Sequence, residues 1–317
     1  MAGLPKIKLK AEIPEELKAE LAPTKWGKIL SVTPVVLTVI ATMLAGLSSS
    51  EMTRAQYDRS LAAQRQSKAG DQWSFFQGKR LRAVVLRTTL DQMMITQAMR
   101  SLDLAALRQA LAGSAAAPGI ETPAGQEALA AMREGRLPKF TAPAFPAAVQ
   151  AALAALEASK PDAEVARLLT EITSGPLDEA LRTAQGHALA LDEHFRGLSQ
   201  VVDACERQLA TISGDGALRR DFVAARMQYN ALRYDAEARV NQTIAELYEL
   251  QVRASNLSAE RHHRRSSRFF YGMLAAQLGV IVSTLAMAAQ KRNLLWGIAA
   301  AAGGIALAFT VYVLLYV

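Results

Sequence analysis

The stretch FFYGMLAAQLGVIVSTLAMAA, residues 269–289, contains no charged side chain, and LLWGIAAAAGGIALAFTVYVLLYV, residues 294–317, follows it after four residues. A third apolar stretch, ILSVTPVVLTVIATMLAGL, occupies residues 29–47. An α-helix needs about 20 apolar residues to cross the hydrocarbon core of a bilayer. The sequence therefore predicts three transmembrane helices, at 29–47, 269–289 and 293–317.

The long region between the first and second spans has a different composition. It is rich in Ala, Leu, Arg, Gln and Glu, which are strong helix formers, and aromatic residues make up only 6% of the whole chain. The formal net charge is +7, from 36 Lys and Arg against 29 Asp and Glu. Beside membrane spans, such an excess is typical of anchoring to anionic lipid headgroups rather than nucleic-acid binding. We expect an all-α protein whose partner is the lipid bilayer.

Proline and glycine divide this region into three parts. Residues 48–112 contain no proline and residues 217–268 contain neither proline nor glycine, so each predicts one long helix. Because both helices meet the same membrane surface, we expect them to pair antiparallel as a stalk. Residues 113–216 hold seven of the eleven prolines and predict a small helical cap of short helices, with loops near 113–124 and 135–146. Residues 1–28 form a polar N-terminal tail.

The returning helix carries apolar residues at alternating intervals of three and four. This seam begins at Leu218 and Phe222, continues through Tyr229, and reaches Leu250 and Leu257. The spacing fits a coiled-coil heptad and equally one face of a bundle helix, so both interpretations remain open. Either one requires a partner helix, which we expect to be the outgoing helix of the stalk.

The segment KAGDQWSFFQGKR, residues 68–80, is the most distinctive motif outside the spans. On a helix Trp73, Phe76 and Arg80 share one face. A stripe of this kind is most often internal packing, and the alternative is an interface or ligand contact. The residues predicted to form such an interface are Lys68, Asp71, Gln72, Trp73, Phe76, Gln77 and Lys79.

This motif resembles a bacterial membrane-protein family catalogued as domain of unknown function 4337. Its members show lysine and alanine, then Asp-Gln-Trp, aromatics, glutamine and lysine, which here start at Lys68 and end at Lys79. The resemblance covers residues 29–85 and 255–317, including a basic turn at Lys291 and Arg292 between the last two spans. It implies the three-span architecture and an enlarged insertion at 113–216. The family has no assigned activity, so the resemblance implies little about function.

A basic cluster, RHHRRSSR, precedes the second span at residues 261–268. We expect its arginines to bind anionic headgroups, at roughly 1 kcal/mol per basic residue. Four arginines would repel a metal ion, so the neighbouring His262 and His263 do not predict a metal site. The predicted headgroup-binding residues are Arg261, Arg264, Arg265 and Arg268.

The sequence contains no recognisable catalytic constellation. It lacks a Gly-rich phosphate loop, a nucleophile elbow and an HExxH motif. His187 and His194 lie seven residues apart with Asp192 between them, and we interpret them as ordinary core or surface residues rather than zinc ligands. No catalytic residue, metal or cofactor is therefore expected. The single cysteine, Cys205, excludes an internal disulfide and is predicted to be a buried thiol.

The spans carry ridges of small residues, which allow transmembrane helices to approach closely. No span contains an ionisable residue, which argues against an ion pathway within one subunit. The ridge residues predicted to pack in the membrane are Ala275, Gly279, Ser283, Gly297 and Gly304.

These features predict a non-enzymatic, membrane-anchored scaffold or accessory subunit that assembles with itself or with a larger membrane complex. The alternative is an oligomeric pore or transporter component lined by Thr33, Thr38, Thr42 or Ser283. A third possibility, an enzyme, would require a polar pocket around His187, Asp192 and His194. Because the N-terminal tail and the turn at 290–292 are short and basic, we expect them in the cytoplasm of a bacterium, with the central region in the periplasm. Arg54, Arg59, Arg65 and the basic cluster at 261–268 lie on the other side, so a cytoplasmic central region is the alternative.

Overall fold

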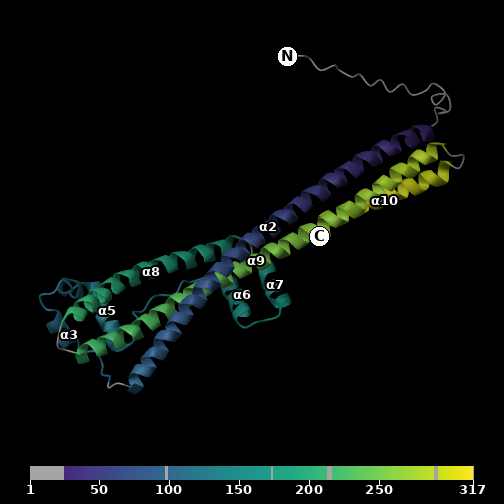
Figure 1. The fold of residues 1–317 in the computed structure, drawn as a ribbon. Helices are drawn as coiled ribbons and strands as arrows, with labels where there is room; N and C mark the ends of the chain where they lie inside the picture. Colours follow the sequence, from purple (N-terminus) through teal and green to yellow (C-terminus); the bar gives the residue numbers. More distant parts are fainter. Residues whose placement is uncertain (1–24, 97–98, 173, 213–215, 289–291, 317) are drawn as a thin grey trace, which may run out of the picture. The chain divides into compact units, whose positions relative to one another are not determined.

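The computed structural model describes residues 25–96, 99–172, 174–212, 216–288 and 292–316. All regular secondary structure in these ranges is helical, which confirms the all-α prediction (Figure 1). Within them, three helices are long and apolar enough to cross a membrane: α2 (Lys25–Thr96), α9 (Gly216–Ala288) and α10 (Arg292–Tyr316). Most of the predicted polar tail and the basic turn at Lys291 lie outside the described residues.

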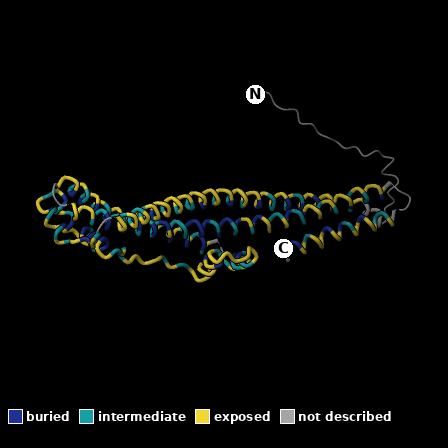
Figure 2. The backbone as a smooth tube through the Cα atoms, turned by 60° about the horizontal axis from the view of Figure 1, so that its bottom comes forward, coloured by how far each residue is buried: buried dark blue, intermediate teal, exposed yellow. Residues whose placement is uncertain are grey.

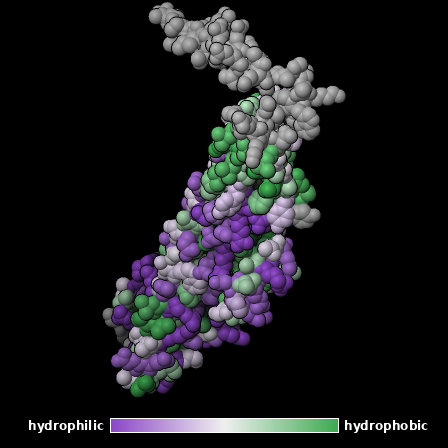
Figure 3. All heavy atoms as spheres, turned by 90° about the vertical axis from the view of Figure 1, so that its right-hand side faces the viewer, coloured by the Kyte–Doolittle hydropathy of each residue, from purple (hydrophilic) through white to green (hydrophobic). Residues whose placement is uncertain are grey.

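The chain divides into two compact units, and both α2 and α9 contribute to each. Unit 1 comprises residues 1–58 and 258–317 and contains the apolar spans, whereas unit 2 comprises residues 59–257. Figure 3 shows hydrophobic side chains on the surface of the span-bearing helices. Each unit is described by itself below.

Unit 1 is held together by close packing of α2, α9 and α10. Leu37 and Leu44 of α2 are buried, at 4% and 2% exposure. A Cβ on Gly279 would lie 3.1 Å from Leu37 Cδ1, and a Cβ on Gly303 would lie 2.6 Å from Leu37 Cδ2. Glycine at these two positions therefore makes room for the leucine of a neighbouring helix.

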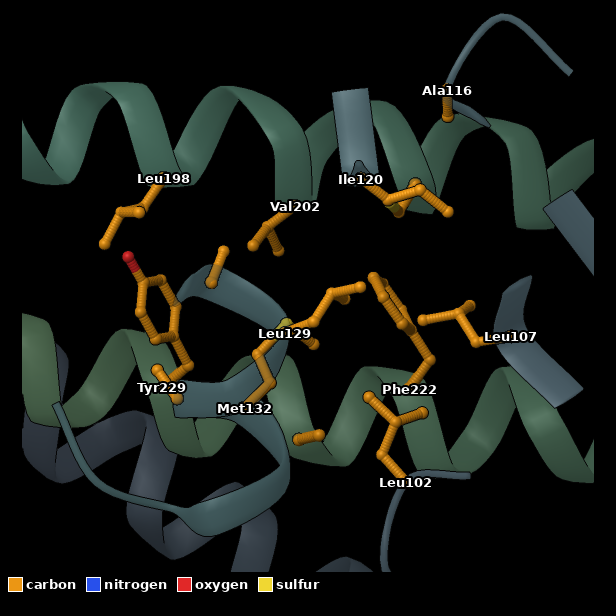
Figure 4. Close-up of a cluster of buried hydrophobic side chains, with 14 of the residues drawn as sticks. Leu102, Leu107, Ala116, Ile120, Leu129, Met132, Leu198, Val202, Phe222 and Tyr229 are labelled. Carbon is orange, nitrogen blue, oxygen red and sulfur yellow. The ribbon is translucent and has the colours of Figure 1, made fainter. Parts of the chain in front are cut away.

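The first hydrophobic cluster of unit 2 lies where α9 begins. It joins α9 to α3 (Leu104–Leu111), α4 (Ala117–Ile120), α5 (Pro123–Glu134) and α8 (Ser174–Thr211). Phe222 and Tyr229 of α9 point toward side chains of α8 and α5, among them Val202 and Leu129 (Figure 4). Burial of these large side chains is the main stabilising contribution here.

The second cluster of unit 2 lies further along α9. It contains buried residues of α6 (Ala147–Glu157), α7 (Asp162–Glu171) and α8, packed on Ile244, Leu247 and Leu250 of α9. The insertion at 113–216 therefore packs on α9 at two places, whereas a single cap was expected. It also contains the 38-residue helix α8 rather than short helices alone, because Pro176 falls in the first turn, where proline is tolerated. The expected loop at 135–146 is present from Arg136 to Pro146, whereas 113–124 includes α4.

The outgoing helix ends earlier than its composition predicts. α2 stops at Thr96, whereas one helix was expected to continue to residue 112. Asp103 caps α3, since its carboxylate accepts hydrogen bonds from the backbone N–H groups of Ala105 and Ala106. Leu102 is 4% exposed within the first cluster. The burial of Leu102 and the capped start of α3 therefore accompany the interruption of the predicted helix.

In unit 2, α2 and α9 pair antiparallel, as predicted. Arg65 pairs with Ser255, Trp73 with Glu249 and Lys79 with Glu237. Residue numbers therefore fall along α9 as they rise along α2, which is the antiparallel order. The buried residues between them are small and recur every seven positions. Figure 2 colours the buried positions of the long helices dark blue. In unit 2 this alanine ladder consists of Ala62, Ala69 and Ala83 of α2 and Ala231, Ala238 and Ala245 of α9.

The predicted apolar seam of α9 faces a different partner. Phe222, Tyr229, Leu247 and Leu250 belong to the two clusters formed with α3–α8, and Ala69 of α2 joins the second of them. The alanine ladder lies on another face of the helix: Ala245 follows Ile244 by one position, about 100° around the axis, and precedes Leu247 by two, about 160° by the shorter way. The large residues therefore bind the insertion, while alanines lie against α2.

Candidate functional site

The inward half of the 68–80 motif packs on α9. The indole N–H of Trp73 donates a 2.6 Å hydrogen bond to Glu249 Oε1, and the Trp73 and Phe76 rings meet edge to face with centroids 5.4 Å apart. Lys79 Nζ lies 2.7 Å from Glu237 Oε2. These contacts assign Trp73, Phe76 and Lys79 to packing within the chain.

Arg80, the last residue of this motif, and Arg87, two turns further along α2, share one buried carboxylate. Asp235 of α9 is 7% exposed. Arg80 Nη1 donates a 2.9 Å hydrogen bond to its Oδ1, and Arg87 pairs with its Oδ2. Because both carboxylate oxygens are satisfied, the buried charge is compensated and α2 is fixed to α9 at this point.

The outward half of the motif lies at the surface. Asp71 and Gln77 are exposed, and Lys68 places its ammonium 6.0 Å from the centre of the Tyr248 ring. Gln72 is half-buried, and its Oε1 has no hydrogen-bond partner in the part of the chain that the structure describes. The seven predicted interface residues are therefore split between internal packing and solvent.

An exposed apolar stripe follows the motif along α2. We call the residues Leu81, Val84, Val85 and Ile95 the outer stripe; they are 64%, 47%, 54% and 86% exposed. Their spacing of three, four and eleven residues places them on one face of the helix. Phe75, 57% exposed, lies beside this face. Sequence reasoning missed the stripe, although the run LRAVVLR already shows large apolar residues on both sides of Ala83.

The basic cluster of unit 1 is partly neutralised by carboxylates. His262 Nδ1 lies 2.6 Å from Glu51 Oε2, and Arg264 Nε donates a 2.9 Å hydrogen bond to Glu260. Ser48 and Ser266 are buried and exchange hydroxyl-to-carbonyl hydrogen bonds of 3.0 and 2.8 Å. This serine pair, which sequence reasoning missed, joins α2 to α9.

Two arginines of the cluster are not neutralised in this way. Arg265 Nε and Arg268 Nη1 are buried and have no hydrogen-bond partner among the described residues. The Arg268 guanidinium lies 5.5 Å from the centre of the Tyr312 ring of α10. The four predicted headgroup-binding arginines therefore have unlike surroundings.

The predicted small residues of the spans separate into inner and outer positions. Gly279 and Ser283 are buried and Ala275 is half-buried. Gly297 and Gly304 are exposed, and a Cβ on either would meet no atom within 4 Å. The inner positions pack within unit 1, whereas the outer ones leave one face of α10 open.

The hydroxyl groups proposed for a pore lining are bonded within unit 1. Thr38 and Thr42 each donate to the carbonyl four residues earlier, and Ser283 donates 2.9 Å to Val280 O. Thr33 Oγ1 accepts a 3.2 Å hydrogen bond from the indole of Trp296. Ser283 is fully buried, so it does not line a surface of this unit.

The histidines of α8 hold an extended segment rather than a polar pocket. The centroid of the Phe140 ring lies 5.0 Å from that of His187 and 5.8 Å from that of His194. His187 Nε2 is 3.0 Å from Thr141 O. Asp192 is exposed and bonds to Arg196 on another face. These three residues do not converge, and no group of three or more His, Cys, Asp or Glu within the described ranges could hold a metal ion.

The first cluster also contains two buried titratable groups. Burial raises the pKa of the Cys205 thiol to about 11 and that of the Tyr229 hydroxyl to about 12. Cys205 is fully buried, which confirms the predicted burial of this thiol. Both side chains are buried among the apolar residues of the first cluster, so both belong to the core.

Residues 26–117 match the family model described as Domain of unknown function (DUF4337). The match confirms the resemblance at residues 29–85, all of which lie within the matched range. The C-terminal part of the resemblance, residues 255–317, lies outside it. Comparison with curated proteins and with solved structures gave no match.

Proposed function

We propose that this protein is a membrane-anchored helical scaffold that assembles with a second copy of itself through the outer stripe of α2. The stripe is the observation that carries the proposal. Four large apolar side chains, each about half exposed or more, line one face of a helix whose opposite face is already packed. Leu81, Val84 and Val85 form one exposed apolar patch, and Ile95 lies further along the same face beyond Thr88 and Gln92. Exposed apolar patches mark interaction sites.

The basic residues beside the stripe contact groups of the same chain. Arg80 and Arg87 flank the stripe, but both pair with Asp235 of the same chain. Arg82 lies 5.8 Å from the Tyr234 ring, a cation–π distance. Asp235 offsets one of the positive charges of Arg80 and Arg87, and salt screens the charge that remains, which limits the repulsion between two α2 faces.

Membrane anchoring would strengthen this association. Three apolar helices orient all copies in the same way and restrict them to two dimensions, which raises the effective concentration of one stripe for another. We place the spans in the inner membrane of a bacterium and unit 2 in the periplasm, because the tail and the short turn are basic. Labelling of Ser114→Cys in a Cys205→Ser background by an impermeant maleimide, only after cell lysis, would contradict this orientation.

The pore alternative has weaker support. It needs polar residues free to line a path between subunits, and the candidate hydroxyls donate to their own helices or lie buried. Conductance of reconstituted protein in liposomes would favour that alternative.

Cysteine cross-linking in the membrane tests the self-association. In a Cys205→Ser background, Thr88→Cys places a thiol on the stripe face of α2, and Glu179→Cys places one on an exposed position of α8. We expect the Thr88 variant to form disulfide dimers efficiently and the Glu179 variant to form few. Adding Val85→Glu should abolish the Thr88 cross-link.

Equal cross-linking at both positions would indicate random collision and would contradict the stripe as an interface. Cross-linking of Thr88→Cys to a different protein, with no homodimer, would favour the accessory-subunit reading instead. The mass of the particle extracted into lipid nanodiscs gives an independent measure of the same association.

A further inference from the structure

The end of the spans in unit 1 is marked by aromatic side chains and by the basic cluster. Tyr271 of α9 and Tyr312 of α10 are 63% and 47% exposed. Exposed tyrosines at the end of an apolar helix are typical of the level where lipid headgroups begin. Arg265 and Arg268 precede Tyr271 on α9 by six and three residues, so they lie at this level.

Burial and charge balance together distinguish these two arginines, because Arg261 and Arg264 are exposed whereas Arg265 and Arg268 are half-buried. Arg264 is exposed and hydrogen-bonded to Glu260, and His262 is paired with Glu51. In the ranges the structure describes, neither Arg265 nor Arg268 has a carboxylate within ion-pair distance. They lie three residues apart, and residues at this spacing share a helix face.

Their burial makes the missing acceptor costly. The Nε of Arg265 and the Nη1 of Arg268 are shielded from solvent without a hydrogen-bond partner among the described residues. A buried guanidinium N–H without an acceptor is unfavourable, because it loses its hydration without replacement. The stacking of Arg268 on Tyr312 orients its guanidinium but provides no acceptor oxygen.

We propose that Arg265 and Arg268, with Tyr312 beside them, bind the phosphate group of an anionic membrane lipid. Guanidinium groups present paired N–H donors that match two phosphate oxygens. A lipid delivers its phosphate to this level while its acyl chains lie along the spans. The site rests on the membrane placement in the proposed function, but it does not require the chain to self-associate.

This site differs from a diffuse attraction of basic residues to a negative surface. A diffuse effect depends on the number of charges, so removing any two arginines of the cluster would weaken it equally. A built site depends on Arg265 and Arg268 in particular. Arg261 and Arg264, which are exposed on the same two turns of α9, supply the matched control.

The test uses the full chain reconstituted with phosphatidylcholine and a minor fraction of phosphatidylglycerol, then extracted in mild detergent. Native mass spectrometry counts the phosphatidylglycerol molecules retained per chain. We expect wild type to retain one, and Arg265→Gln/Arg268→Gln to bind it about 30-fold more weakly. Arg261→Gln/Arg264→Gln should remain within about threefold of wild type. Arg265→Lys/Arg268→Lys, which conserves charge, should fall between them.

Several outcomes would overturn the proposal. Equal losses in the two glutamine pairs would indicate a diffuse effect, and retention unchanged in Arg265→Gln/Arg268→Gln would remove the site. A loss of thermal stability with retention intact would assign the arginines to the carbonyl end of α10. Displacement of the lipid by inorganic phosphate would assign a free phosphate ion as the ligand.

The particle mass separates this proposal from the proposed function. Retention that depends on Arg265 and Arg268 in a monomeric particle would support the lipid site and reject self-association. Dimers without specific retention would do the reverse.

Discussion

Two faces of α9 in unit 2 pack by different means. One face buries large side chains, such as Phe222 and Tyr229, against α8 and α5. The other presents alanines every seven residues toward α2 and is bordered by polar contacts from Asp235 and Glu249. The first face is stabilised by apolar burial, whereas the second depends on close backbone approach with hydrogen bonds at its edges.

This difference predicts opposite mutational sensitivities. The large-residue face should suffer most from truncation, because a truncated side chain leaves a cavity. The alanine face should suffer most from enlargement, because no space is left between the helices.

Truncating the large-residue face should have the largest effect. Phe222 is fully buried in the first cluster, and Phe222→Ala should cost about 3–5 kcal/mol. Cys205, the only cysteine, lies in the same cluster, so its maleimide labelling rate under native conditions reports local opening. We expect the rate to rise by about two orders of magnitude or more.

Arg219→Ala, on an exposed position of the same helix, supplies the control and should leave the labelling rate near that of wild type. If Phe222→Ala labels no faster than this control, the first cluster does not protect the thiol.

Enlarging the alanine face should have an intermediate effect. Ala69 is fully buried on α2, whereas its neighbour Gly70 is exposed and has nothing within 4 Å of a built Cβ. Ala69→Leu should cost about 1–3 kcal/mol through overpacking. Gly70→Leu should be neutral or stabilising, because leucine favours the helix more than glycine does. Thermal unfolding followed by circular dichroism compares the pair, and a tolerated Ala69→Leu would argue against close approach at this point.

A buried carboxyl between the two faces should have the smallest effect. Glu246 is 5% exposed, and desolvation raises its pKa, while a hydrogen bond from Gln242 opposes the shift. Because the folded pKa lies above the unfolded value, folding is favoured when Glu246 is protonated and loses that support as pH rises through the folded pKa. Glu246→Gln should therefore raise the unfolding temperature at neutral and alkaline pH, and the gain should shrink on acidification. A gain of the same size at acidic and alkaline pH would show that ionisation is not its cause.

Helix α2 illustrates what could be predicted from local sequence and what could not. Its apolar span and its lack of internal proline beyond Pro34 predicted a long helix. Its end at Thr96 was missed, because Ser101–Ala112 has adequate helical propensity and the break depends on burying Leu102. The pairing of Trp73, Phe76 and Lys79 with α9 agrees with the packing interpretation of the motif, but their partners Glu249 and Glu237 are some 160 residues or more away in sequence.

The candidate lipid site likewise has one part that the local sequence predicted and another that depends on distant residues. A cluster of four arginines before an apolar span predicted contact with headgroups as a group. The surroundings of the basic residues depend on the carboxylates of Glu260 and Glu51 and on the ring of Tyr312, and two of these three residues come from other helices. Sequence spacing cannot show which basic residue a distant carboxylate neutralises.

The sequence alone determined the helical class, the three membrane-length spans and the buried character of Cys205, because these follow from composition and from local periodicity. The tertiary structure decided which face of α9 meets which partner, where α2 ends, and which side chains of the motif remain exposed. These features depend on contacts between residues far apart in the chain. The partner of each face of α9 is therefore known only once the neighbouring helices are in place.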